Sequence, residues 1–128
     1  DNVNENKGII YLKETSGKSY FSSKENTVYW NPGQGIVTTE YVSLSPTSVL
    51  SHEFDHANQK LNNPEQRNID TKSPCPQYKN KEERRVIEGS EQKVALRLGE
   101  IKEGQVTRKD HLGVGYKTES PITNKPKS

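Results

Sequence analysis

Short apolar runs separated by polar turn residues make up the first third of the chain. Runs rich in β-branched and aromatic residues predict three strands, at 8–14, 19–22 and 27–30. The Asn-Pro-Gly-Gln-Gly segment at 31–35 is a strong break, and 36–44 is expected to be extended. This part of the chain is therefore expected to form a short antiparallel sheet.

The hydrophobic period changes to that of a helix after position 45. Ser45 can cap free amides and Pro46 fits a first helical turn, so we expect a helix from about Pro46 to Lys60. Its predicted core face has apolar residues at i, i+4, i+7 and i+11, namely Leu50, Phe54, Ala57 and Leu61. The Asn-Asn-Pro segment at 62–64 ends this helix.

A second helical pattern covers 80–99, after a long predicted loop at 65–79. Asn80 is a candidate cap, with Glu83 at the capping-box spacing. Gly89 and Ser90 interrupt the pattern, which fits either one helix with a weak point or two helical pieces. The region 104–116 has no clear pattern, and the polar segment 117–128 is expected to be a flexible tail.

Composition limits the classes that remain. The chain has 128 residues, of which 27% are hydrophobic, so we expect a single α+β domain over 1–128 with a small core. A net charge of +2 without a basic, aromatic-rich stripe argues against nucleic-acid binding. No apolar run is long enough for membrane insertion. Because Cys75 is the only cysteine, any metal must be held by His, Asp or Glu.

The segment 52–56 reads His-Glu-Phe-Asp-His and carries the candidate chemistry. Residues four apart share a helix face, so His52 and His56 can each direct one imidazole nitrogen at the same ion. They would supply two of the three protein ligands of a catalytic zinc. Glu53 can reach a zinc-bound water, take its proton and pass that proton to a leaving amine. These roles predict hydrolysis of a peptide bond.

The helical wheel places this histidine pair outside the predicted apolar stripe. The competing interpretation is a pair of ordinary surface histidines. Asp55, inside the motif, either orients a neighbouring ligand or faces solvent.

The third ligand is expected on the second helix, where a carboxylate can pack against the histidine pair. Glu91 is the first choice because it opens the more regular part of that helix. The other candidates are Glu88, Glu83, Asp110 and His111. His111 and Tyr116 are also candidates to stabilise a tetrahedral intermediate. The strand at 27–30 is expected either to align substrate along an exposed edge or to belong to the core.

Four blocks of sequence together resemble a known family. They are V-Y-W-N-P-G at 28–33, S-P-T-S-V-L-S-H-E-F-D-H-A-N-Q at 45–59, E-E-R-R-V-I-E-G-S-E at 82–91 and R-K-D-H-L-G-V-G-Y at 108–116. The pattern is similar to the small zincin-type metallopeptidase domains found among effectors of bacterial pathogens and at the tips of polymorphic Rhs-type toxins. The similarity spans roughly residues 26–116.

This resemblance implies a zincin-like α+β fold with one zinc ion and proteolytic attack on a protein of a target cell. It implies secretion or delivery into that cell, and a cognate immunity protein or inhibitor as a partner. By position, His52 and His56 match the ligands, Glu53 the general base and Glu91 the downstream acidic residue. Asp55 departs from the small residue that is frequent there. A metal-dependent amidase acting on cell-wall peptide and a non-catalytic domain with a structural zinc are the alternatives.

Overall fold

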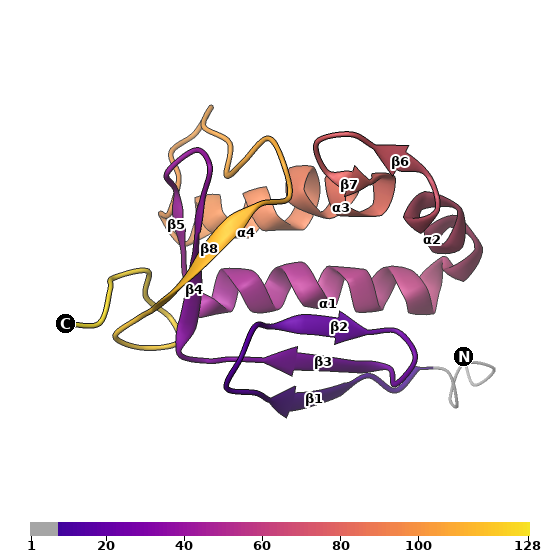
Figure 1. Ribbon diagram of the computed structural model, residues 1–128, viewed down its shortest axis with the longest axis horizontal. Coiled ribbons are helices and arrows are strands. Elements are labelled where there is room, and N and C mark those ends of the chain that lie inside the picture. The colour runs from indigo at the N-terminus through magenta and orange to yellow at the C-terminus, as the bar shows by residue number, and fades with distance from the viewer. Residues whose placement is uncertain (1–7) are drawn as a thin grey trace.

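The computed structural model describes residues 8–128 and arranges them in layers around one long helix, α1 (Pro46–Asn62). Figure 1 shows a three-stranded sheet on one side of α1 and a row of shorter helical segments on the other. A second three-stranded sheet crosses one end of this arrangement. The expected mixture of small sheets and helices is confirmed, and it is compatible with an α+β fold.

The first sheet has the order β1-β3-β2, with β1 at Tyr11–Glu14, β2 at Tyr20–Ser22 and β3 at Thr27–Trp30. The three predicted strands are present. β2 and β3 pair in antiparallel fashion as expected, but β1 runs parallel to β3. The prediction of a purely antiparallel sheet is wrong here because β1 lies on the far side of β3, beyond the β2–β3 hairpin.

The second sheet is antiparallel, with the order β5-β4-β8. β4 spans Gln34–Thr38, β5 spans Ser43–Leu44 and β8 spans Gly113–Lys117. The single extended segment expected at 36–44 is divided by a turn in which Tyr41 has a positive φ of 61°. β8 comes from the region in which the sequence showed no clear pattern.

Gly35 lies at the closest approach within this second sheet. A Cβ atom at Gly35 would overlap the Leu44 carbonyl oxygen and lie 2.9 Å from the Tyr116 ring. We expect Gly35→Ala to lower the free energy of unfolding by about 1–3 kcal/mol through overpacking. Urea denaturation followed by circular dichroism measures this change in the free energy of unfolding. Gly17→Ala, with no atom within 4 Å of the added Cβ, is the matched control, and equal effects of both changes would contradict this account.

Helix α1 begins where the sequence predicts. The Ser45 side chain accepts a hydrogen bond from the Ser48 amide at 3.2 Å, and Pro46 occupies the first turn. The helix ends at Asn62, two residues beyond the expected Lys60.

The buried face of α1 is the predicted one only at Ala57. His52 and His56 are buried, with 6% and 5% of their surfaces exposed, whereas Leu50 and Phe54 are only half-buried. The helical wheel assumes that the core lies on one side of α1. In the structure, the first sheet packs against one side of α1, and the shorter helices pack against the other side. The histidine edge therefore points into the interior.

The region between the two main helical segments is not the loop that was predicted. It contains helix α2 (Pro64–Thr71) and a two-stranded hairpin formed by β6 (Pro74–Cys75) and β7 (Lys79–Asn80). Pro64 begins α2, because a proline that stops one helix also fits the first turn of the next.

The second helical segment is continuous but changes its winding. α3 (Lys81–Val86) passes into a π-helix, η2 (Ile87–Glu91), and then into α4 (Gln92–Arg97). The predicted weak point at Gly89–Ser90 therefore lies inside the π-helix. In a regular α-helix, eight residues turn the side chain at 91 by about 80° relative to that at 83. The wider π turn reduces this rotation, so that both residues face α1.

The segment after β8 is attached to the body of the protein, although a flexible tail was expected there. The Pro121 carbonyl accepts hydrogen bonds from the amide and the hydroxyl of Thr47, at 3.1 and 2.8 Å. The Asn124 side chain donates to the Ser43 carbonyl at 2.9 Å. These contacts hold the C-terminal residues against the second sheet and the start of α1.

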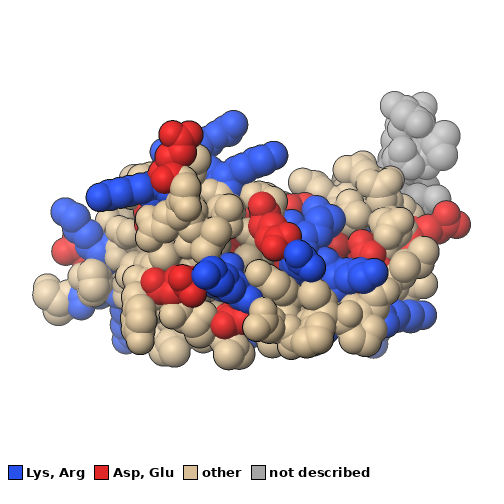
Figure 2. Space-filling model, turned by 90° about the horizontal axis from the view of Figure 1, so that it is seen from above, with Lys and Arg blue, Asp and Glu red and all other residues tan. Residues whose placement is uncertain are grey.

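The surface carries both signs of charge. Figure 2 shows Lys and Arg side chains interspersed with Asp and Glu over the face that it displays. None of the helices within residues 8–128 has the length and apolar character needed to cross a bilayer.

Candidate metal centre

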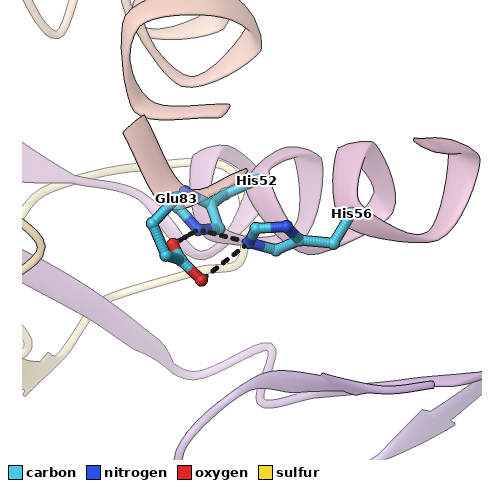
Figure 3. A group of neighbouring side chains, drawn as sticks. All are labelled: His52, His56 and Glu83. Carbon is cyan, nitrogen blue, oxygen red and sulfur yellow. Dashed lines mark hydrogen bonds and ion pairs between the residues drawn. The ribbon is translucent and has the colours of Figure 1, made fainter. Parts of the chain in front are cut away.

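The two motif histidines converge on one point beside α1. Their Nε2 atoms are 3.2 Å apart, and their rings meet edge to face with centroids 4.9 Å apart. The spacing of four residues on one helix produces this convergence, as the sequence predicted. Figure 3 shows both rings directed toward a side chain from the neighbouring helix.

That side chain is Glu83 of α3. Its Oε1 atom lies 3.2 Å from Nε2 of His52, and its Oε2 atom lies 3.1 Å from Nε2 of His56. The Asn80 side chain accepts a hydrogen bond from the Glu83 amide at 2.8 Å and fixes the first turn of α3. Of the carboxylates considered from sequence, the structure thus brings Glu83 to the histidine pair.

Glu91, the first choice from sequence, lies on the other side of the same histidine. Its Oε1 atom is 2.8 Å from Nδ1 of His52, opposite the Nε2 atom that meets Glu83. Glu82 does the same for the second histidine, with Oε2 at 2.9 Å from Nδ1 of His56. Each ring thus has a carboxylate on Nδ1 and directs Nε2 toward the shared point, which is how histidine ligands of metals are commonly oriented.

An arginine and a threonine hold Glu91 in this position. Arg108 donates to both carboxylate oxygens of Glu91, at 2.6 and 3.0 Å, and the Thr107 hydroxyl donates at 2.7 Å. All three residues are buried. Burial opposes ionisation of Glu91, but His52 and Arg108 outweigh it and hold the pKa of Glu91 at about 2.

A second arginine supports Glu82. Arg85 donates to both oxygens of Glu82, at 3.1 and 3.0 Å, and also to Asp55 at 2.9 Å. The Ser90 hydroxyl donates to the other Asp55 oxygen at 2.5 Å. Asp55 therefore acts on the site only through Arg85 and Glu82, which fits the orienting role considered for it from sequence.

The donor atoms lie close enough together to hold one metal ion. Zinc binds histidine nitrogens at about 2.0–2.1 Å, which places neighbouring donors of a tetrahedron about 3.3 Å apart. Here the two Nε2 atoms are 3.2 Å apart, His52 Nε2 lies 3.2 Å from one Glu83 oxygen, and His56 Nε2 lies 3.1 Å from the other. Two imidazoles and one carboxylate can therefore hold one metal ion.

The electrostatics of the group also favour a bound cation. Burial lowers the pKa of His52, but hydrogen bonds with Glu83 and Glu91 outweigh burial and raise it to about 10. The pKa of His56 is raised in the same way by Glu82 and Glu83. The hydrogen bonds with both histidines hold the pKa of Glu83 far below its usual range despite burial. The carboxylates thus require positive charge on or between the two rings, from protons or from a metal.

Glu53 faces the same cavity and is half-buried. Burial raises its pKa, and the neighbouring histidines oppose that rise. It is not one of the three donors that converge. Glu53 lies beside the backbone of Phe21 on β2, the edge strand of the first sheet. A carboxylate of raised pKa beside a metal site is suited to proton transfer.

The remaining sequence candidates lie farther from the three donors. The exposed Glu88 pairs with Arg84 at 3.2 Å, and Asp110 accepts from Thr39 at 2.8 Å. Tyr116 donates to the Asn124 carbonyl at 2.6 Å and does not line the cavity. His111 lines the cavity, with Nδ1 3.0 Å from the Gln77 carbonyl.

The strand considered as a substrate edge is the central strand of its sheet. β3 pairs on both sides, so its hydrogen-bonding edges are occupied. Trp30 donates its indole N–H to the Pro46 carbonyl at 2.8 Å and ties β3 to the start of α1. The strand edge next to the site belongs to β2 instead.

The site opens into a cavity of about 630 Å³. The cavity lies between the first sheet, α1, α2, the β6–β7 hairpin and α3, and the residues just before β8 complete its wall. The sequence interpretation missed the supporting residues Glu82, Arg85 and Arg108. The only signal for Glu82 was its place in the paired acidic residues at 82–83, and no local signal marks Arg108, which meets Glu91 across 17 positions.

Comparison of the chain with protein-family models, curated proteins and solved structures finds no match. What the site can do therefore follows from its own geometry and chemistry.

Proposed function

We propose that the chain is a zinc-dependent endopeptidase. The observation that supports this most directly is the convergence of donor groups from His52, His56 and Glu83, with Glu53 facing the same cavity. Two imidazoles and a carboxylate are a common protein ligand set of catalytic zinc.

Each residue has a distinct task in the proposed reaction. His52, His56 and Glu83 hold the ion, and Glu82 and Glu91 orient the two rings. When bound, zinc lowers the pKa of a coordinated water and polarises the carbonyl group to be attacked. Glu53 takes a proton from the attacking water and gives it to the departing amine. Its raised pKa makes this carboxylate a stronger proton acceptor than an exposed glutamate.

A structural zinc is supported less well by this geometry. Structural sites are closed by four protein ligands, whereas catalytic sites keep one position for water or substrate. Within residues 8–128 the group has three converging donors and adjoins a cavity. An amidase acting on cell-wall peptide would use the same chemistry. Cleavage of an unstructured protein but not of cell-wall peptide would separate the endopeptidase from that alternative.

Binding of zinc is expected to release protons. Because the pKa of His52 is raised to about 10, its ring holds a second proton at neutral pH that zinc must displace, and the raised pKa of His56 acts in the same direction. Calorimetric titration of the metal-free protein at pH 7, in buffers of different ionisation enthalpy, should give one zinc per chain and about one to two protons released. Glu83 contributes none, since its pKa is lowered.

The pH dependence has a definite sign. As pH rises from 7 toward 10, the histidines lose their protons, so proton release should shrink and zinc affinity should increase. The metal-free protein should lose stability over the same range, because the raised pKa of His52 stabilises the fold only while the ring is protonated. Zinc affinity that is independent of pH between 6 and 9 would contradict the proposed ligands.

We also propose that the domain acts as a delivered effector or toxin and has a cognate immunity protein or inhibitor. The support for this part is the similarity of the four sequence blocks, which cover most of residues 26–116. Growth arrest on expression of the protein in a target cell, absent for Glu53→Gln, would test it.

A further inference from the structure

The cavity beside the metal centre contains a cluster of cations that the proposed mechanism does not use. Its lining includes Lys18 before β2, Arg67 on α2 and Lys79 on β7. Within residues 8–128, none of the three forms an ion pair. All three line the cavity that a peptide would enter to reach the metal.

Arg67 is the best defined of these cations. Its guanidinium carbon lies 5.4 Å from the centre of the Phe21 ring, so that the side chain rests against edge strand β2. Its Nε atom is buried and has no acceptor among the described residues. Its two terminal nitrogens are not buried without a partner in the same way, and no hydrogen bond engages them within residues 8–128, so they are available to an acceptor from another molecule in the cavity.

The other charged groups that line the cavity are engaged elsewhere. Arg108 is bound to Glu91, and Glu82 is bound to Arg85 and His56. Glu83 meets both motif histidines. His111 makes its contact with the Gln77 carbonyl.

The charged side chains of the cavity that have no ion-pair partner therefore fall into two groups. Among the acidic groups of the cavity, only Glu53 remains for proton transfer, whereas three cations remain without an anionic partner. A divalent ion held by the histidines would offset the acidic groups around it. The wall near Arg67 would then present an excess of positive charge to a substrate.

We propose that Arg67, assisted by Lys18 and Lys79, forms a subsite for a carboxylate group of the substrate. This inference rests on the proposed function for its peptide ligand. The planar guanidinium matches a carboxylate with two parallel hydrogen bonds, which its two terminal nitrogens can donate. The protein would then select peptides by a negative charge near the cleaved bond.

The first test uses end-blocked peptides that are identical except for Glu or Gln at one position, moved stepwise along both sides of the cleaved bond. The zinc-loaded protein is expected to favour Glu in kcat/KM by about 10- to 100-fold at one position. Arg67→Gln should bring this ratio close to one by slowing cleavage of the Glu peptide only. The matched control is Arg97→Gln, an exposed arginine on α4 outside the cavity, which should keep the preference.

A chain terminus is the second source of the same chemistry. Peptides without acidic side chains are compared with free and amidated C-termini. A preference for the free end that Arg67→Gln removes assigns the subsite to the terminal carboxylate, and a preference for Glu alone assigns it to a side chain. Equal rates for every peptide, or an equal loss for all peptides in Arg67→Gln, would overturn the subsite.

A second measurement separates the subsite from the reaction. In zinc-loaded Glu53→Gln protein, the NMR signal of the Arg67 Nε–H group should shift and saturate with the Glu peptide but not with the Gln peptide. If the signal moves and no peptide is cleaved by the unaltered protein, the subsite stands and the proposed function fails. If peptides are cleaved and the signal does not move, the subsite is wrong. Arg67→Lys keeps the positive charge but cannot donate two parallel hydrogen bonds to a carboxylate, so it should retain part of the preference for Glu. This variant replaces Arg67→Gln in the test if Arg67→Gln fails to fold.

Discussion

Glu53→Gln is expected to abolish nearly all hydrolysis while leaving zinc binding unchanged. The amide keeps the size of the side chain but cannot accept the proton of the attacking water, so kcat should fall by about 10²- to 10⁴-fold. Glu53 is not among the converging donors, so zinc content should stay the same. Cleavage of an unstructured protein, followed alongside metal content by mass spectrometry, measures both quantities.

The comparison needs a variant of the same type at a neutral position. Glu65→Gln changes an exposed glutamate in the first turn of α2 and should leave both hydrolysis and zinc content intact. If Glu53→Gln retained full activity, Glu53 would not be the general base. If Glu53→Gln lost zinc as well as activity, the assignment of Glu53 as a general base that does not bind the metal would be wrong.

Glu83→Ala is expected to lower zinc affinity more than any change at Glu91. Removing Glu83 deletes one of three donor groups, so we expect a loss greater than about 100-fold. Glu91→Gln leaves all three donors in place and disturbs only the partner of His52 Nδ1, for which a loss of about 10- to 100-fold is expected. Competition with a chromophoric zinc chelator gives both affinities.

For stability we expect the reverse order of these two variants: Glu91→Gln should lower the free energy of unfolding more than Glu83→Ala. Glu91→Gln removes one charge of a buried ion pair and leaves Arg108 uncompensated, which is expected to cost about 3–5 kcal/mol of unfolding free energy. Glu88→Ala, on an exposed face of the same helical segment, is the control for both measurements. A larger loss of zinc affinity in Glu91→Gln than in Glu83→Ala would restore Glu91 as the third ligand.

Local patterns predicted the elements that carry the site. The cap at Ser45, the proline after it and the histidine spacing were sufficient to place α1 and to pair His52 with His56. The capping signal at Asn80 likewise marked the start of α3. These features depend on residues within one or two turns of each other, so no knowledge of the tertiary structure was needed.

The details that depend on packing could not be predicted in this way. The capping-box spacing would turn the Glu83 side chain back toward Asn80, yet the histidines on α1 bind it instead. The buried histidine edge follows from layers on both sides of α1, which a wheel drawn for one helix does not contain. The π-helix changes which carboxylates face α1, and the Gly-Ser pair signalled only that something was irregular there.

The π-helix between α3 and α4 makes the number of residues in this stretch as important to the site as the identity of Glu91. Gly89 has open space around it, so a methyl group there meets no other atom within 4 Å. Removing one residue from 87–91, by contrast, would favour regular winding and turn everything beyond it by about 100°. Glu91 and its arginine would then leave His52, while Glu82 and Glu83 would stay. A change of residue at Gly89 is therefore tolerated, but a deletion or insertion in this segment is not.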